Sequence, residues 1–175
     1  MNYLKHLFNV VCDSINEARD GNLTSIKYLF KIGSINDAST ISTASRYGHM
    51  DLVKYLLENG APVDGYAIIA AAQNGRLDLV KYLVENGAPI DEYTINAAAQ
   101  IGHFEIIKYL LENGAQIDKY LISTAAWSGK LDIIKYLIQN VLDTKNPALI
   151  ISIAENTQID HYIKNIKKYL ERCGF

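Results

Sequence analysis

The sequence repeats itself every 27 residues, and this period constrains the fold more than any other feature. The tripeptide KYL begins at five positions with that spacing, namely Lys27, Lys54, Lys81, Lys108 and Lys135. Two glycine series keep the interval: Gly21, Gly48, Gly75, Gly102 and Gly129, and also Gly33, Gly60, Gly87 and Gly114. An aspartate lies four residues after each glycine of the second series, at Asp37, Asp64, Asp91 and Asp118. Such regularity indicates an array of structural repeats.

One copy, residues 66–92, reads YAIIAAAQNGRLDLVKYLVENGAPIDE. Its alanine-rich part, residues 67–74, predicts a short helix that ends at Gly75. Leu77, Val80 and Leu83 then recur at helical spacing, which predicts a second, amphipathic helix. The Asn-Gly pair after it is typical of a left-handed helix stop. Each repeat is therefore expected to form helix, tight turn, longer helix and short loop.

A single helical pair cannot bury both of its apolar faces, so neighbouring pairs must stack into a solenoid. Pairs of alanines recur where adjacent first helices are expected to approach each other: Ala71 and Ala72, Ala98 and Ala99, and Ala125 and Ala126. The total of 175 residues suits one domain.

The segments GHMDLVKYLLENGAPVD, GRLDLVKYLVENGAPID and GHFEIIKYLLENGAQID resemble the second half of ankyrin repeats. No copy has the strand signature of leucine-rich repeats, whose period is similar. The resemblance covers residues 12–146 as five units, with a degenerate sixth at the C-terminus. It implies an all-α, ankyrin-type helical solenoid. The array is rich in the segments KYL and ENGA, and in this respect it is similar to ankyrin proteins of giant DNA viruses of amoebae.

The repeats are shorter than the usual ankyrin repeat of about 33 residues. The missing residues fall where the family builds its β-hairpin finger, so we predict truncated or absent fingers. Asp64, Asp91 and Asp118 are then expected to cap the next first helix directly.

The expected organisation is one continuous domain with three parts. Residues 1–38 form an N-terminal cap and the first repeat, residues 39–146 form four repeats of 27 residues, and residues 147–175 form a degenerate capping repeat. Amphipathic end helices are predicted over residues 2–11 and 157–172.

Charge and composition exclude several classes of function. A net charge of −2 gives no reason to expect binding to nucleic acid or an anionic membrane. The two cysteines and scattered histidines offer no metal-ligand spacing, and no phosphate loop or nucleophile motif is present. His49 and His103 occupy turn positions, for which we expect a structural role. We therefore expect no enzyme, no cofactor and no metal, and a monomer in the cytoplasm (the host cytoplasm if viral).

The residues that follow each alanine pair vary between repeats, and the resemblance implies that they face a concave binding groove. We expect partner contacts from Arg46, Tyr47, Gln73, Asn74, Gln100, Ile101 and Trp127. These include residue types enriched in interface hot spots. The alternative for Trp127 is packing on a neighbouring helix.

Three tyrosines, Tyr66, Tyr93 and Tyr120, form a second column with the same period. They either present a tyrosine ladder to a partner at the groove rim or, the interpretation we favour, fill the space of the missing fingers. The resemblance implies a non-catalytic protein–protein interaction scaffold with an unidentified protein partner. The alternatives are a self-associating structural component and a small-ligand-binding protein with a pocket between first helices.

Overall fold

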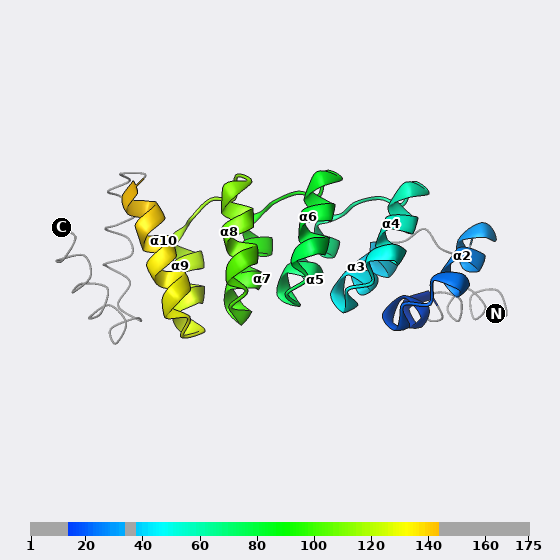
Figure 1. Cartoon of the computed structure of the whole chain (residues 1–175), viewed down its shortest axis with the longest axis horizontal. Coiled ribbons are helices and arrows are strands. Elements are labelled where there is room, and N and C mark those ends of the chain that lie inside the picture. The colour runs from blue at the N-terminus through cyan, green and yellow to red at the C-terminus, as the bar shows by residue number, and fades with distance from the viewer. Residues whose placement is uncertain (1–13, 34–37, 144–175) are drawn as a thin grey trace, which may run out of the picture. The chain divides into compact units, whose positions relative to one another are not determined.

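The chain folds into α-helices joined by short turns (Figure 1). The computed structural model describes residues 14–33 and 38–143. No strand occurs among these residues, so the all-α expectation and the absence of β-hairpin fingers are confirmed there. The predicted end helices over residues 2–11 and 157–172, and the capping repeat over residues 147–175, lie outside the described residues.

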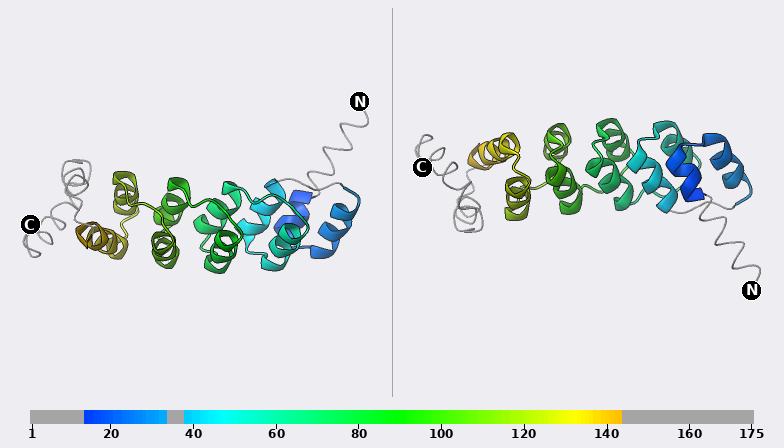
Figure 2. Two further views of the ribbon diagram at one scale, coloured as in Figure 1. Left: turned by 90° about the horizontal axis from the view of Figure 1, so that it is seen from above. Right: turned by 90° about the horizontal axis from the view of Figure 1, so that it is seen from below.

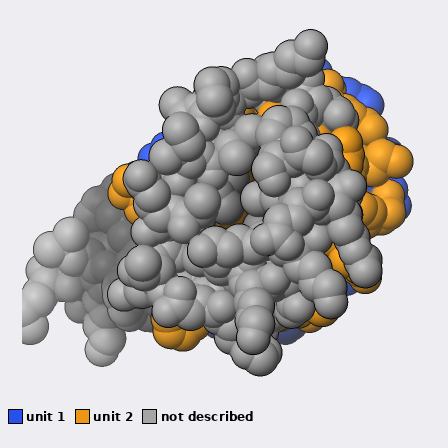
Figure 3. All heavy atoms as spheres, turned by 90° about the vertical axis from the view of Figure 1, so that its left-hand side faces the viewer, with its two compact units in different colours: residues 1–94 blue, residues 95–175 orange. Residues whose placement is uncertain are grey.

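The chain divides into two compact units, residues 1–94 and 95–175, which Figure 3 distinguishes by colour. The expectation of a single continuous domain stays a prediction.

The first unit begins with a helical segment over residues 14–20. The helices that follow are α2 (Leu23–Lys31), α3 (Ala38–Tyr47), α4 (Met50–Glu58), α5 (Gly65–Gln73) and α6 (Leu77–Glu85). The two first helices, α3 and α5, pack against each other, and each also packs on the second helix of its own repeat. Within this unit, α3 and α5 lie in one layer, and α4 and α6 lie in another (Figure 2).

The second unit continues the same alternation. It contains most of α7 (Glu92–Ile101), then α8 (Phe104–Glu112), α9 (Lys119–Trp127) and α10 (Leu131–Asp143). The hydroxyl of Ser128 donates a hydrogen bond of 3.0 Å to the carbonyl of Ala99, which ties the end of α9 to the end of α7. Helices α4, α6, α8 and α10 begin 27 residues apart, as the sequence period requires.

The second helices α4, α6 and α8 end in a repeated Schellman motif. After α4, Gly60 has a φ of 86°, and the Ala61 N–H donates back to the Leu56 carbonyl at 3.0 Å. The side-chain amide of Asn59 donates to the Tyr55 carbonyl at 2.7 Å. These bonds satisfy carbonyls that a helix end would otherwise leave unpaired, which explains the recurring Asn-Gly-Ala.

The first helices begin at the aspartates expected to cap them, and this expectation is confirmed. Asp64 accepts from the Ala67 N–H at 3.0 Å, and Asp118 accepts from the Leu121 N–H at 2.8 Å. Asp91 accepts from the Thr94 N–H at 2.9 Å. Because the cap sets the start, α5 begins at Gly65, earlier than the predicted residue 67, and Asn74 is its C-cap.

The core combines small side chains from first helices with branched ones from second helices. The alanine pairs at 71/72, 98/99 and 125/126 are all buried. Leu79, Val80 and Leu83 of α6 are buried as well. In the first unit the KYL tripeptides also link neighbouring second helices, because Lys27 Nζ lies 5.2 Å from the Tyr55 ring centroid and Lys54 Nζ lies 5.6 Å from that of Tyr82.

Replacing the cap of α5 tests this account of the helix starts. Asp64→Ala is expected to lower the free energy of unfolding by about 1 kcal/mol, because the Ala67 N–H loses its acceptor. Asp64→Asn keeps an acceptor oxygen and serves as the control. Urea unfolding followed by circular dichroism measures both, and equal losses in the two variants would contradict the capping role.

A buried hydroxyl offers a second test. Ser45 is fully buried, its Oγ has no hydrogen-bond partner, and alanine occupies the equivalent positions Ala72, Ala99 and Ala126. Ser45→Ala is therefore expected to raise the free energy of unfolding by about 1 kcal/mol. Ser39→Ala makes the same change at an exposed site of α3, so it isolates the effect of helix propensity. A gain no larger than that control would show that the buried hydroxyl costs nothing.

Candidate functional site

The predicted groove residues lie at the C-terminal ends of the first helices, and all are exposed. Arg46 and Tyr47 end α3, Gln73 ends α5, with Asn74 as its C-cap, Gln100 and Ile101 end α7, and Trp127 ends α9. The indole of Trp127 is the most open of the large apolar side chains among the described residues, at 81% exposure. The alternative in which Trp127 packs on a neighbouring helix is therefore wrong.

The three tyrosines of the second column also project into solvent. Each is the second residue of its first helix, and their exposure lies between 63% and 74% for Tyr66, Tyr93 and Tyr120. The interpretation that they fill the space of missing fingers is wrong. The short loop leads through the aspartate cap directly into the helix, and in α5 the positions facing the core are taken by Ala67 and Ile68.

The two columns share one face of α5, α7 and α9. Tyr66 and Gln73 are seven residues apart, which corresponds to two helical turns and about 10 Å along the axis. The same spacing relates Tyr120 to Trp127 on α9. We call this solvent-facing side of the first helices the outer face. The outer face includes both the groove residues and the three tyrosines. The sequence had suggested that the tyrosines lie apart from the groove residues, at the rim of the groove.

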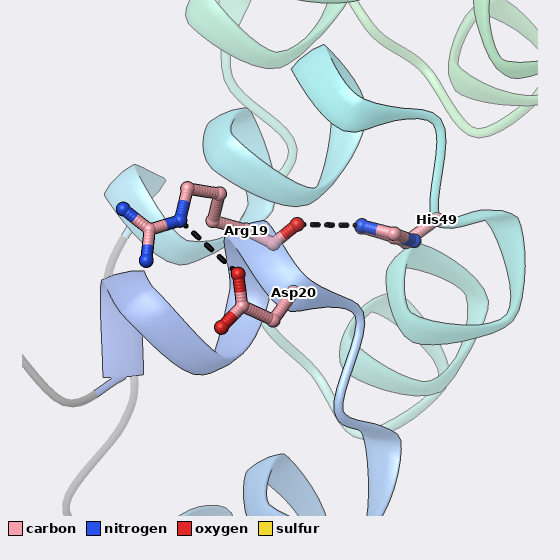
Figure 4. A network of polar contacts seen from close by, with 3 residues as sticks. All are labelled: Arg19, Asp20 and His49. Carbon is pink, nitrogen blue, oxygen red and sulfur yellow. Dashed lines mark hydrogen bonds and ion pairs between the residues drawn. The ribbon is translucent and has the colours of Figure 1, made fainter.

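The turn between two helices is covered by a side chain from the next repeat. A Cβ added at Gly21 would lie 2.5 Å from the His49 ring, so the close approach requires glycine there. His49 Nε2 donates a hydrogen bond of 2.8 Å to the Arg19 carbonyl (Figure 4). The structural role expected for His49 is confirmed by this contact.

Arg76 takes the place of His49 in the next repeat. Its Nε lies 3.0 Å from the Cβ position of Gly48, beside the end of α3. In the second unit, Lys130 lies over Gly102 in the same way. Neither Arg76 nor Lys130 was among the expected contact residues, although their position directly after the turn glycine is the signal that identifies them.

In the part of the chain that the structure describes, histidine, cysteine and carboxylate side chains form no group of three or more that suits a metal ion. None of the helices in those residues has the length and apolar character needed to cross a bilayer.

Comparisons with known proteins agree with this architecture. The family model described as ankyrin repeats (3 copies) matches residues 15–94, 71–148 and 94–168. The crystal structure of the human ASB11 ankyrin repeat domain is similar, with a TM-score of 0.62 and 28% sequence identity, over 72% of this chain and 67% of that chain. No curated protein sequence matches the chain. The expected helical solenoid is thus confirmed as the fold class.

Fluorescence of the only tryptophan tests the exposure of the outer face. Because Trp127 is 81% exposed, the emission maximum of the native protein is expected to lie close to that of the urea-unfolded chain. Trp127→Ser is expected to change the free energy of unfolding by less than about 0.5 kcal/mol. A blue-shifted native emission, or a large loss of stability, would mean that the indole packs on the protein.

Proposed function

The chain belongs to the ankyrin-repeat family, and on that premise we propose that it is a non-catalytic scaffold that binds a partner protein. Ankyrin repeats in general are protein–protein interaction modules. The binding surface we propose is the outer face of the first helices, with contacts from the groove residues and the tyrosines Tyr66, Tyr93 and Tyr120.

The observation that carries this proposal is the exposure of large aromatic side chains on that face. Trp127 and the three tyrosines lie largely in solvent. Tryptophan and tyrosine are enriched in interface hot spots, since they add contact area with few rotatable bonds. Ile101, also exposed on this face, contributes further apolar area in the second unit.

The helices that carry these side chains are held in place before any partner arrives. Asp64 and Asp118 cap the starts of α5 and α9, and the alanine pairs pack the helices against their neighbours. Binding would therefore cost little ordering entropy beyond that of the exposed side chains. This preorganisation is the mechanism that we propose for recognition.

The second helices offer a less suitable surface. Their exposed positions carry a repeated pattern of acidic residues and lysines, as in Asp51, Lys54 and Glu58 of α4. A mixed, hydrated charge pattern of this kind is typical of a solvent-facing side. Partner binding through the outer face is accordingly favoured over the opposite layer.

Three further expectations belong to the same proposal. The scaffold would act as a monomer, would reside in the cytoplasm, and would derive from a giant virus of amoebae, in which case the cytoplasm is that of the host. These stay predictions based on composition and on the style of the repeats.

Affinity capture with mass spectrometry tests the proposed face. Wild-type protein and a Tyr66→Ser/Trp127→Ser variant are each immobilised and exposed to a lysate of the cells in which the protein occurs. Proteins that bind the wild type are expected to be recovered at least about tenfold less by the variant, because it lacks two aromatic anchors.

The matched control is Tyr28→Ser, which removes a tyrosine of similar exposure from α2 in the layer of second helices. It is expected to recover the same proteins as the wild type. Equal recovery by all three forms would exclude the outer face as the binding surface. Circular dichroism confirms that each variant keeps its helices.

A further inference from the structure

Charge differs between the first helices α3 and α5 and the second helices α4 and α6 of the first unit. Residues 38–49 and 65–76, which comprise α3, α5 and the turns after them, contain Arg46 and Arg76 but no aspartate or glutamate. The second helices α4 and α6 carry four acidic residues and two lysines, a net charge of −2. Residues 38–49 and 65–76 are therefore cationic, although Asp64 caps α5 and the helical segment over residues 14–20 carries Glu17, Arg19 and Asp20.

The first two turns of this unit show how the cationic site arises. At the first turn, Arg19 forms an ion pair of 3.1 Å with Asp20, and His49 covers Gly21 (Figure 4). One repeat later, Tyr47 occupies the position equivalent to Asp20, and Arg76 occupies the position equivalent to His49. The first turn is thus neutralised within the protein, whereas the second gains a cation and loses its carboxylate.

The side chain of Arg76 lies over the turn that follows α3, the helix that ends with Arg46 and Tyr47. The guanidinium carbon of Arg76 lies 3.2 Å from the Cβ position of Gly48, two residues after Arg46. Across residues 14–33 and 38–143, neither Arg46 nor Arg76 has a hydrogen bond or an ion pair through its side chain. Both side chains are exposed, as is Tyr47 between them in the sequence. We call Arg46, Tyr47, Gly48 and Arg76 the arginine junction.

Guanidinium groups bind carboxylates through two parallel N–H donors, which gives geometric selectivity as well as attraction. Two such groups beside an exposed tyrosine suit a segment that carries acidic and apolar side chains together. The net negative charge of α4 and α6 would repel the same segment from these two helices. Charge complementarity at the arginine junction therefore selects the chemistry of the partner segment.

We propose that the partner is a protein that presents an acidic segment to the arginine junction. Arg46 and Arg76 bind aspartate or glutamate side chains of that segment, and Tyr47 and Tyr66 contact its apolar side chains. This inference rests on the proposed function and names the class of partner.

Selection from a random-peptide phage library on immobilised wild-type protein tests the proposal. The selected peptides are expected to be enriched in aspartate and glutamate relative to the starting library. A fluorescein-labelled synthetic copy of the strongest peptide then serves as the probe in anisotropy titrations. Binding is expected to weaken roughly tenfold for each arginine removed in Arg46→Gln and Arg76→Gln, and to weaken further as salt is added.

Two variants make the test specific to the junction. Arg19→Gln removes an arginine at the same repeat position that is already paired with Asp20, so affinity for the probe is expected to stay close to that of the wild type. Tyr47→Asp places a carboxylate beside Arg46, as in the first turn, and is expected to weaken binding without removing an arginine. Urea unfolding of every variant shows whether the fold is kept, since Arg76 packs on Gly48.

Several results would overturn the proposal. These are a selection that yields no peptides, peptides without acidic enrichment, or affinities that the arginine variants leave unchanged. Binding of a labelled single-stranded RNA that depends on both arginines, with no acidic enrichment among peptides, would assign the junction to nucleic acid instead. If Tyr66→Ser/Trp127→Ser loses captured proteins while Arg46→Gln/Arg76→Gln retains them, the outer face binds partners but the acidic class is wrong.

Discussion

The close approach of neighbouring first helices is the constraint on which the rest of the structure depends. It requires alanine on the sides that meet, and those alanines are buried in both units. It also requires glycine at the turns, where the next repeat places a ring, a guanidinium or a lysine stem against the backbone. Because these positions are used for packing, only one side of the first helices is exposed to solvent. The tyrosines, Trp127 and Arg46 all lie there, so the variable chemistry of the chain is confined to the surface that stacking cannot use.

Much of this fold follows from the sequence because its determinants are local and repeated. The asparagine–glycine stops and the aspartate caps each act within a few residues, so their positions predict the ends of the helices. The alanine pairs recur with the period of the repeat, so their positions predict where neighbouring first helices meet. Exposure was harder to predict. The interpretation of Tyr66, Tyr93 and Tyr120 as packed rings failed because it assumed a space to be filled, whereas the capped helix starts directly after the loop. A ring at the second helical position can point inward or outward, and only the packed neighbours decide which.

The candidate site shows the same division between local and non-local information. The exposed ends of the first helices were predicted from their variability between repeats. Arg76 was not, because its importance depends on lying against Gly48 in the preceding repeat. Comparison of equivalent positions between repeats reveals the difference in charge. Arg19 is paired with Asp20 in one repeat, whereas Arg46 in the next repeat is followed by Tyr47. In a repeat protein, each copy can be compared with its neighbour. A substitution between copies that leaves a charged side chain without an ion pair points to an external partner.

The hydrogen bonds that join one repeat to the next have a consequence for how the chain folds. Ser128 reaches Ala99 and His49 reaches Arg19, contacts that span only 29 and 30 residues of sequence. A chain whose contacts stay this close has a low contact order, and such chains fold quickly because little loop-closure entropy must be lost before contacts form. Folding can begin at any well-packed pair and spread outward, one copy at a time. The same locality lets whole copies be gained or lost during evolution, so the length of the array, and with it the length of partner it can accommodate, is free to change.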